Sequence, residues 1–167
     1  AITAMLVPKM TKSLLVSASL DGTVRVLDVS SRSPRLIHVL KGHERAVVAV
    51  AYSDWCKLLF SAGVDHELRV WNPFSEATIA CLRAHDAPLV AVEAMASTPQ
   101  LFSADSAGIV NVWDVRSLTR VQTLRASAGA LCTALALLPL HSRLVVAARR
   151  LTVFTEGERE GEHDATA

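Results

Sequence analysis

The chain has few cysteines and no long apolar run. The first observation bears on its redox compartment and the second on whether it enters a membrane. Its three cysteines, Cys56, Cys81 and Cys132, lie far apart, form no C-x-x-C pair and cannot all pair with one another. We interpret them as reduced thiols of an intracellular, cytoplasmic protein, because disulfides form in oxidising compartments. The longest apolar stretch covers only residues 130–140, well short of the roughly 18 residues that a membrane helix needs. We therefore expect no membrane partner.

The composition also lacks an excess of one charge and any pattern of metal ligands. Seventeen lysines and arginines face sixteen acids, and no basic run is interleaved with aromatic residues, so we expect no nucleic-acid partner. No group of His, Cys, Asp or Glu has metal-site spacing, and no phosphate loop is present. We therefore predict no metal, no cofactor and no catalytic residue. Five acids follow position 155, and we predict an acidic, disordered tail over residues 156–167.

What the chain does have is internal repetition. The segment SASLDGTVRVLD begins at Ser17, SAGVDHELRVWN at Ser61 and SADSAGIVNVWD at Ser103, which are offsets of 44 and 42 residues. The pair Gly42-His43 recurs as Ala84-His85 at the same interval. A period of about 40 to 45 residues that combines a GH-type pair with a WD-type pair is typical of propeller blades.

The local pattern predicts short strands throughout, hence an all-β fold. Apolar runs of four to eight residues alternate with turns rich in Gly, Pro, Ser and Asp. We expect four units, over residues 1–41, 42–83, 84–125 and 126–155, of which three have four strands and the last has three. Its first strand is predicted over residues 131–137. Closed propellers typically need four to eight blades. Because the chain also begins at Ala1 rather than Met, we predict a β-propeller fragment completed by further blades of a longer parent chain.

The repeats resemble the WD-repeat (WD40-type) β-propeller family over about residues 2–154. The resemblance implies four-stranded antiparallel blades and a protein that assembles complexes rather than catalyses a reaction. A shorter stretch, residues 66–93, continues as VWNP rather than VWD. That stretch is similar to WD-repeat proteins associated with cilia and axonemal microtubules.

One polar set in the second unit, His43, Ser61, Asp65 and Trp71, has two interpretations. A Ser-His-Asp catalytic triad would need an exposed nucleophile and an oxyanion hole, and the sequence offers no candidate for either. The family resemblance implies instead a structural network, in which the histidine bonds to the aspartate while the serine and tryptophan complete a chain of hydrogen bonds. The physics suits this role, because a fully paired buried network fixes one packing.

The third unit keeps most of this set. His85, Ser103 and Trp113 occupy the equivalent positions, but Ala107 stands where the aspartate is expected. Asp105, two residues earlier, is the predicted substitute.

The first and last units depart further from the pattern. The first has Ser17 and Asp21, which we include in the structural network, but Leu27 replaces the tryptophan. The last has Ser127 at the histidine position and Phe154 at the tryptophan position. We expect the last unit to depend on its neighbours for stability.

Loops rather than strands are expected to carry the partner surface. On one face the candidates are Arg45 and the adjacent pair Arg149 and Arg150, which could hold an acidic peptide or stay solvated. On the opposite face Trp55 and Phe74 lie in predicted turns. They are candidate anchors for a partner, and the alternative is that each folds back onto its own unit.

The preferred function is a non-catalytic scaffold within a multiprotein assembly, with tubulin or axonemal proteins as candidate partners and the cilium as candidate location. The alternative is a substrate receptor of a cullin–RING ubiquitin ligase. Residues 113–116 read WDVR and match the WDxR ending of receptors that dock on the ligase's propeller adaptor. In that role Arg116 would pair with a carboxylate of the adaptor.

Overall fold

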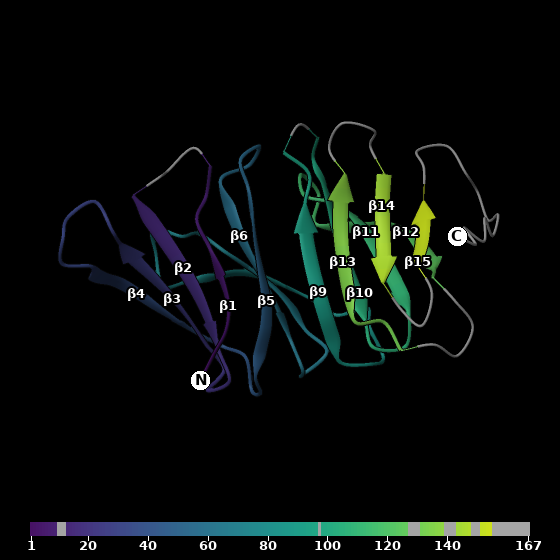
Figure 1. Cartoon of the computed structure of the whole chain (residues 1–167), viewed down its shortest axis with the longest axis horizontal. Coiled ribbons are helices and arrows are strands. Elements are labelled where there is room, and N and C mark those ends of the chain that lie inside the picture. The colour runs from purple at the N-terminus through teal and green to yellow at the C-terminus, as the bar shows by residue number, and fades with distance from the viewer. Residues whose placement is uncertain (10–12, 97, 127–130, 139–142, 148–150, 155–167) are drawn as a thin grey trace.

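The computed structural model describes residues 1–9, 13–96, 98–126, 131–138, 143–147 and 151–154, which form four separate antiparallel sheets (Figure 1). We refer to these sheets as blades one to four. Blade one contains β1 (Ile2–Leu6), β2 (Leu14–Ser19), β3 (Thr23–Asp28) and β4 (Arg35–Lys41). Blade two contains β5 (Val47–Ser53), β6 (Leu58–Gly63), β7 (Leu68–Trp71) and β8 (Thr78–Leu82). Blade three contains β9 (Leu89–Ala94), β10 (Gln100–Asp105), β11 (Ile109–Asp114) and β12 (Thr119–Arg125). Blade four contains β13 (Ala134–Leu138), β14 (Arg143–Ala147) and β15 (Leu151–Phe154).

Each strand pairs with its neighbours in chain order, so every blade is a meander. The register repeats from blade to blade at the position opposite the repeated serine. Ser17 pairs with Arg25, Ser61 with Arg69 and Ser103 with Asn111. The three repeats that are visible in the sequence therefore occupy equivalent places in three equivalent sheets.

The first strands of the blades lie next to one another. Strand β1 contacts β5, β5 contacts β9, and β9 contacts β13 (Figure 1). Because each blade is a meander, its turns alternate between two faces. The face that carries Trp55 in the β5–β6 turn and Phe74 in the β7–β8 turn is called the Trp55 face. The opposite face, with His43 before β5 and Asp65 between β6 and β7, is called the His43 face.

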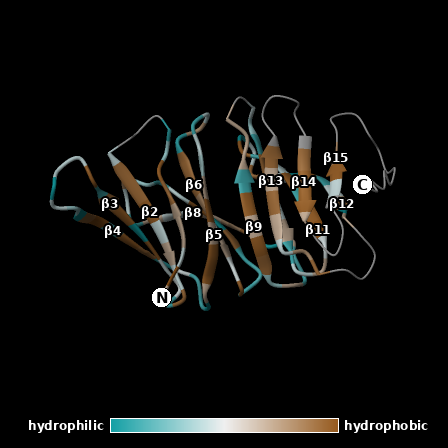
Figure 2. Ribbon diagram, in the orientation of Figure 1, coloured by the Kyte–Doolittle hydropathy of each residue, from teal (hydrophilic) through white to brown (hydrophobic). Residues whose placement is uncertain are grey.

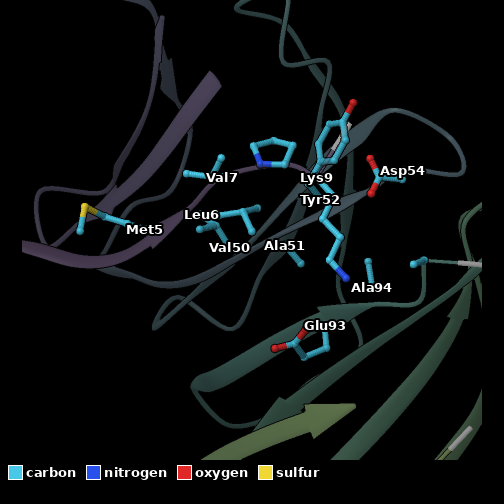
Figure 3. Close-up of a pocket in the computed structure, with 12 residues that line it drawn as sticks. Met5, Leu6, Val7, Lys9, Val50, Ala51, Tyr52, Asp54, Glu93 and Ala94 are labelled. Carbon is cyan, nitrogen blue, oxygen red and sulfur yellow. The ribbon is translucent and has the colours of Figure 1, made fainter. Parts of the chain in front are cut away.

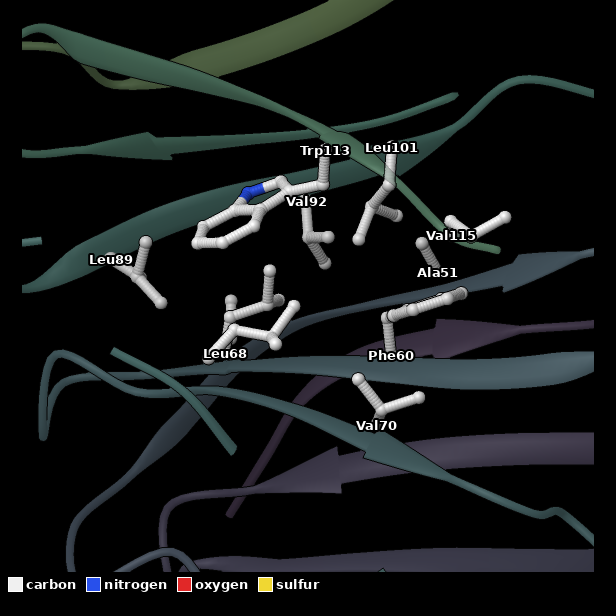
Figure 4. Packing of buried hydrophobic residues seen from close by; sticks show 11 residues of the cluster. Ala51, Phe60, Leu68, Val70, Leu89, Val92, Leu101, Trp113 and Val115 are labelled. Atoms are coloured by element: carbon white, nitrogen blue, oxygen red, sulfur yellow. The ribbon is translucent and has the colours of Figure 1, made fainter. Parts of the chain in front are cut away.

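The hydrophobic core consists of layers between successive blades. One cluster joins blades one and two, a second joins blades two and three, and a third joins blades three and four. Apolar residues concentrate on the strands and polar residues at the turns (Figure 2). In the middle layer Trp113 and Leu101 of blade three face Phe60 of blade two (Figure 4). Full burial of one such side chain stabilises the fold by about 1.5–3 kcal/mol.

The predicted all-β architecture of three four-stranded blades and one three-stranded blade is confirmed for the described residues. The largest difference in strand position is in blade four, where β13 begins at Ala134 instead of residue 131. Cys132 just before it is buried against the layer shared with blade three, without ladder pairing of its own. The predicted tail, residues 156–167, lies outside the described residues. The described part of the chain contains no helix with the length and apolar character that crossing a membrane demands.

Candidate functional site

The polar set of blade two is assembled from four places in the chain. His43 lies in the connection between β4 and β5, Ser61 in β6, Asp65 in the β6–β7 turn and Trp71 at the end of β7. His43 Nδ1 lies 2.9 Å from Asp65 Oδ2, and His43 Nε2 lies 2.7 Å from Ser61 Oγ. The Trp71 indole N–H donates to Ser61 Oγ at 2.8 Å. We call this linear arrangement of Trp, Ser, His and Asp the relay.

The chemistry of the groups fixes the direction of each bond in the relay. A carboxylate only accepts, so His43 Nδ1 is protonated and its N–H donates to Asp65. Nε2 of the neutral ring then accepts the Ser61 hydroxyl proton, and Ser61 Oγ accepts from Trp71. Burial lowers the pKa of His43, although the Asp65 carboxylate acts in the opposite direction. A lowered pKa favours the neutral ring. These hydrogen bonds also require the neutral ring, because Nε2 has to accept.

The turns that carry the relay hold the Asp65 carboxylate from both sides. The backbone N–H of Glu44 donates to Asp65 Oδ2 at 3.0 Å, and that of Glu67 donates to Oδ1 at 3.3 Å. Gly63 leaves room for this arrangement, because a Cβ there would collide with Asp65 Oδ1 and His43 Nδ1. Asp65 therefore joins the two turns of the His43 face through one carboxylate.

Burial rules out the catalytic interpretation of this set. Ser61 is 0% exposed, and its hydroxyl is used by the His43 ring and the Trp71 indole. A triad needs a serine that a substrate can reach. The geometry therefore serves packing, because it pairs every polar group of the set inside the blade.

Three possible metal ligands also meet at this point, but other groups already use them. One donor atom each of His43, Asp65 and Glu67 lies within 4.8 Å of the others. The two Glu67 oxygens accept from Arg69 Nη2 and from Arg83 Nε, the latter at 2.7 Å. A metal ion would have to displace both guanidinium groups and the proton on His43 Nδ1. The arrangement thus matches an ion-pair network rather than a metal site.

Blade three contains the same relay with a different source of carboxylate. His85 Nε2 lies 2.7 Å from Ser103 Oγ, which accepts from the Trp113 indole N–H at 2.8 Å. Asp105 Oδ2 lies 2.8 Å from His85 Nδ1, in the role that sequence comparison suggested for it. Burial lowers the pKa of His85, as in blade two, against the opposing effect of Asp105.

Asn111 extends the relay of blade three and was not expected from the sequence. Its side-chain N–H₂ donates to the carbonyl of Ala84 at 3.0 Å and lies 3.1 Å from His85 Nε2. Its Oδ1 accepts from Thr123 Oγ1 at 2.8 Å. The available signal was its place opposite Ser103, a position where blade two has Arg69, itself part of the Glu67 network.

Blade one does not form the relay within the described residues. Asp21 bonds locally, to the Thr23 hydroxyl at 2.6 Å, the Thr23 backbone N–H at 3.0 Å and Arg25 Nη2 at 2.9 Å, and these bonds hold its pKa well below the usual range. Ser17 is buried in β2, while Leu27 occupies the tryptophan position opposite Leu15. The predicted pairing of Ser17 and Asp21 in one network thus becomes a turn network around Asp21 that does not include Ser17.

The candidate partner residues are divided between the two faces. On the Trp55 face, Trp55 is 47% exposed and Phe74 is 58% exposed, so neither folds back fully onto its blade. On the His43 face, Arg45 is exposed. Arg149 and Arg150 lie outside the described residues, as does Ser127.

Arg116 lies just beyond β11 and folds back onto the end of that strand. Its Nε lies 3.0 Å from Asp114 Oδ1, and its Nη2 bonds to Oδ2 of the same carboxylate. This forked contact lowers the pKa of Asp114 to about 2. The guanidinium that the ligase interpretation requires for docking is thus already paired, in an exposed position.

Comparison with known proteins finds a WD-repeat match in part of this chain. The family model for the WD domain, G-beta repeat, matches residues 34–72. Cilia- and flagella-associated protein 337 B of Tetrahymena thermophila is 35% identical over 65 residues, which is 39% of this chain and 5% of that protein. Protein transport protein SEC13 of Coccidioides immitis is 37% identical over 65 residues, or 38% of this chain and 21% of that protein. The chain thus spans only a small part of these curated relatives.

The solved structure of U3-55K resembles nearly the whole chain. The TM-score is 0.84 at 25% sequence identity, over 93% of this chain and 49% of that one. The repeat model covers β4 of blade one and β5 to β7 of blade two, and the structural match extends the likeness to the other blades. The repeat model thus places a WD domain, G-beta repeat, within residues 34–72, and the sheets and the structural match show a β-propeller blade fold for the described residues.

Proposed function

We propose that this chain is a non-catalytic scaffold that binds a partner protein through Trp55 and Phe74. The WD-repeat propeller family is generally non-catalytic, and its fold implies protein–protein interaction. The observation that carries the proposal is the exposure of two large aromatic side chains, 47% for Trp55 and 58% for Phe74, in two turns of one face. Aromatic anchors of this kind contribute much of the binding energy at protein interfaces.

The two turns present these side chains on ordered backbone. Asn72 Oδ1 accepts the Phe74 backbone N–H at 2.9 Å, and the intervening Pro73 is buried. The Lys57 N–H donates to the Ser53 carbonyl at 2.8 Å and closes the Trp55 turn. Side chains on turns that are already ordered lose less conformational entropy on binding. This favours a partner that meets the Trp55 face as a preformed surface.

We further propose that the blades belong to a larger propeller of a ciliary or axonemal complex, with tubulin or axonemal proteins as partners. The similarity to a cilia- and flagella-associated protein supports this location, over 39% of this chain. The U3-55K chain is about twice as long as the part that this chain matches, which supports further blades in the parent.

The test is affinity capture of the full-length protein from ciliated cells, with crosslinking and mass spectrometry. We expect tubulin or axonemal proteins to be crosslinked near Trp55 and Phe74. Trp55→Ala and Phe74→Ala are each expected to lower recovery about tenfold or more. The matched control is Val121→Ala, which truncates a still more exposed apolar side chain (67%) on the outer strand β12 and should leave recovery unchanged.

The ligase interpretation predicts a different result in the same experiment. Recovery of a cullin and its adaptor, crosslinked near Arg116 and lost on charge reversal at that residue, would overturn the proposal. The forked pair with Asp114 does not favour this outcome, because docking through Arg116 would first have to break it.

A further inference from the structure

A cleft opens at the start of the β5–β6 turn, where the first strands of three blades end. It has a volume of about 320 Å³ and is lined by the end of β1, the end of β5 and the end of β9 (Figure 3). Leu6, Val50 and Ala51 supply apolar wall, whereas Lys9, Asp54 and Glu93 supply charge. Asp54 precedes Trp55 in the chain, so the cleft adjoins the candidate partner surface.

Two polar atoms of this cleft are buried without a hydrogen-bond partner in the described part of the chain. They are the Tyr52 hydroxyl oxygen and Asp54 Oδ1. Burial raises the pKa of Tyr52, and the Asp54 charge adds to the effect. An unpaired buried acceptor destabilises a protein, because it has lost its hydrogen bonds to water.

Glu93 is the second carboxylate of the cleft. Burial raises its pKa, and among the described residues no basic side chain forms an ion pair with it. Lys9 is the basic residue on the lining and forms no ion pair within that same set either. Two carboxylates therefore face one lysine, and the cleft has an excess of negative charge and of acceptors.

We propose that this cleft binds an arginine side chain of the partner protein, with Glu93 and Asp54 as its counter-ions. This inference rests on the proposed function, because the partner has to approach the Trp55 face. A guanidinium offers five N–H donors in one plane and no acceptor, which suits a cleft with two carboxylates. The apolar wall accommodates the aliphatic stem of the arginine.

The test uses the full chain and two small probes, Nα-acetyl-arginine methylamide and its uncharged analogue with citrulline. Amide shifts of the isotopically labelled chain report binding at each position. We expect the arginine probe to shift resonances at the ends of β5 and β9. The citrulline probe is expected to bind at least tenfold more weakly. Equal binding of the two probes would overturn the proposal without any substitution that could affect folding.

Variants then locate the site. Glu93→Gln and Asp54→Asn keep shape but remove charge, and each is expected to weaken arginine binding at least fivefold. The matched control is Glu76→Gln, an exposed acid (68%) of the β7–β8 turn outside the cleft, which should bind as the wild type does. Arginine affinity within twofold of wild type in both cleft variants would overturn the proposal.

The two proposals fail in different ways. If Trp55→Ala abolishes partner recovery but the arginine probe does not bind, the cation site is wrong and the scaffold proposal stands. If the probe binds at Glu93 but Trp55→Ala leaves recovery unchanged, the cation site stands and the aromatic anchors are wrong.

Discussion

In blade two the carboxylate that holds the histidine comes from the β6–β7 turn, whereas in blade three it comes from the end of strand β10. Asp65 lies four residues after Ser61, and Asp105 lies two residues after Ser103. The position that Asp105 occupies in blade three is Gly63 in blade two, where a Cβ would collide with Asp65 and His43. Each blade therefore fills the same space with one carboxylate, and what is preserved is the contact rather than the sequence position.

In blade one the tryptophan position is occupied by Leu27. Asp21 has the sequence position of Asp65, but it bonds to Thr23 and Arg25 at the surface. The relay is a property of complete sets of residues, and single residues at the right spacing do not form it.

The largest effect is expected from removing the tryptophans. Trp71 is 0% and Trp113 is 4% exposed, and each packs in a layer between two blades. Replacing either by Ala is expected to lower the free energy of unfolding by about 3–5 kcal/mol. Leu27→Ala, at the equivalent place in blade one, should cost less because Leu27 is partly exposed. Chemical denaturation measures the free energy of unfolding of the three variants. Equal losses in all three would contradict the expectation that the cost follows the burial of the replaced side chain.

A smaller effect is expected from removing one polar member of a relay. His43→Ala, Asp65→Ala and Asp105→Ala each leave a buried partner unpaired, so each is expected to destabilise the fold by roughly 1–3 kcal/mol. Asp21→Ala is the comparison in blade one, and it should leave the melting temperature almost unchanged because Asp21 bonds at the surface. Wild-type melting temperatures for both His43→Ala and Asp65→Ala would refute the network.

The smallest effect is expected from pH. Burial lowers the pKa of His43 and His85 below the ordinary value of 6.5, so the unfolded chain binds these protons more readily. The stabilisation that the two neutral histidines contribute is present above about pH 6.5 and decreases as the pH falls below this value. The melting temperature should therefore drop between pH 7.5 and 5.5. This decrease in melting temperature should be smaller in a His43→Gln and His85→Gln double variant. An unaltered decrease in that variant would show that other groups cause it.

Much of this fold could be predicted because a repeat gives three views of the same unit. The serine-to-tryptophan spacing placed β6 with β7 and β10 with β11, and the alternation of apolar residues marked the strands. The sequence also allowed the prediction that Asp105 supplies the carboxylate expected at position 107, where the chain has Ala107. Both positions lie near the same turn. Asn111 was not, because its role depends on lying opposite Ser103 in a neighbouring strand and near Ala84 in another turn.

The cleft could not be predicted for a different reason. Its charged residues, Lys9, Asp54 and Glu93, come from three blades and share no repeat position or motif. What brings them together is the spacing between adjacent first strands, which the layers of apolar side chains determine. The burial that leaves Tyr52 and Asp54 unpaired is likewise a property of packing between blades rather than of local sequence.

The most direct test of the relay is to move the carboxylate of blade two to the position that blade three uses. Gly63→Asp alone should destabilise the fold, because its side chain collides with Asp65 and His43, and Asp65→Ala alone should leave His43 unpaired. The free energy of unfolding of the double variant, measured by denaturant titration, should exceed the additive expectation from the two single variants by at least about 1 kcal/mol. Additive losses, within about 0.5 kcal/mol, would contradict the claim that the relay is one interchangeable structural contact in both blades.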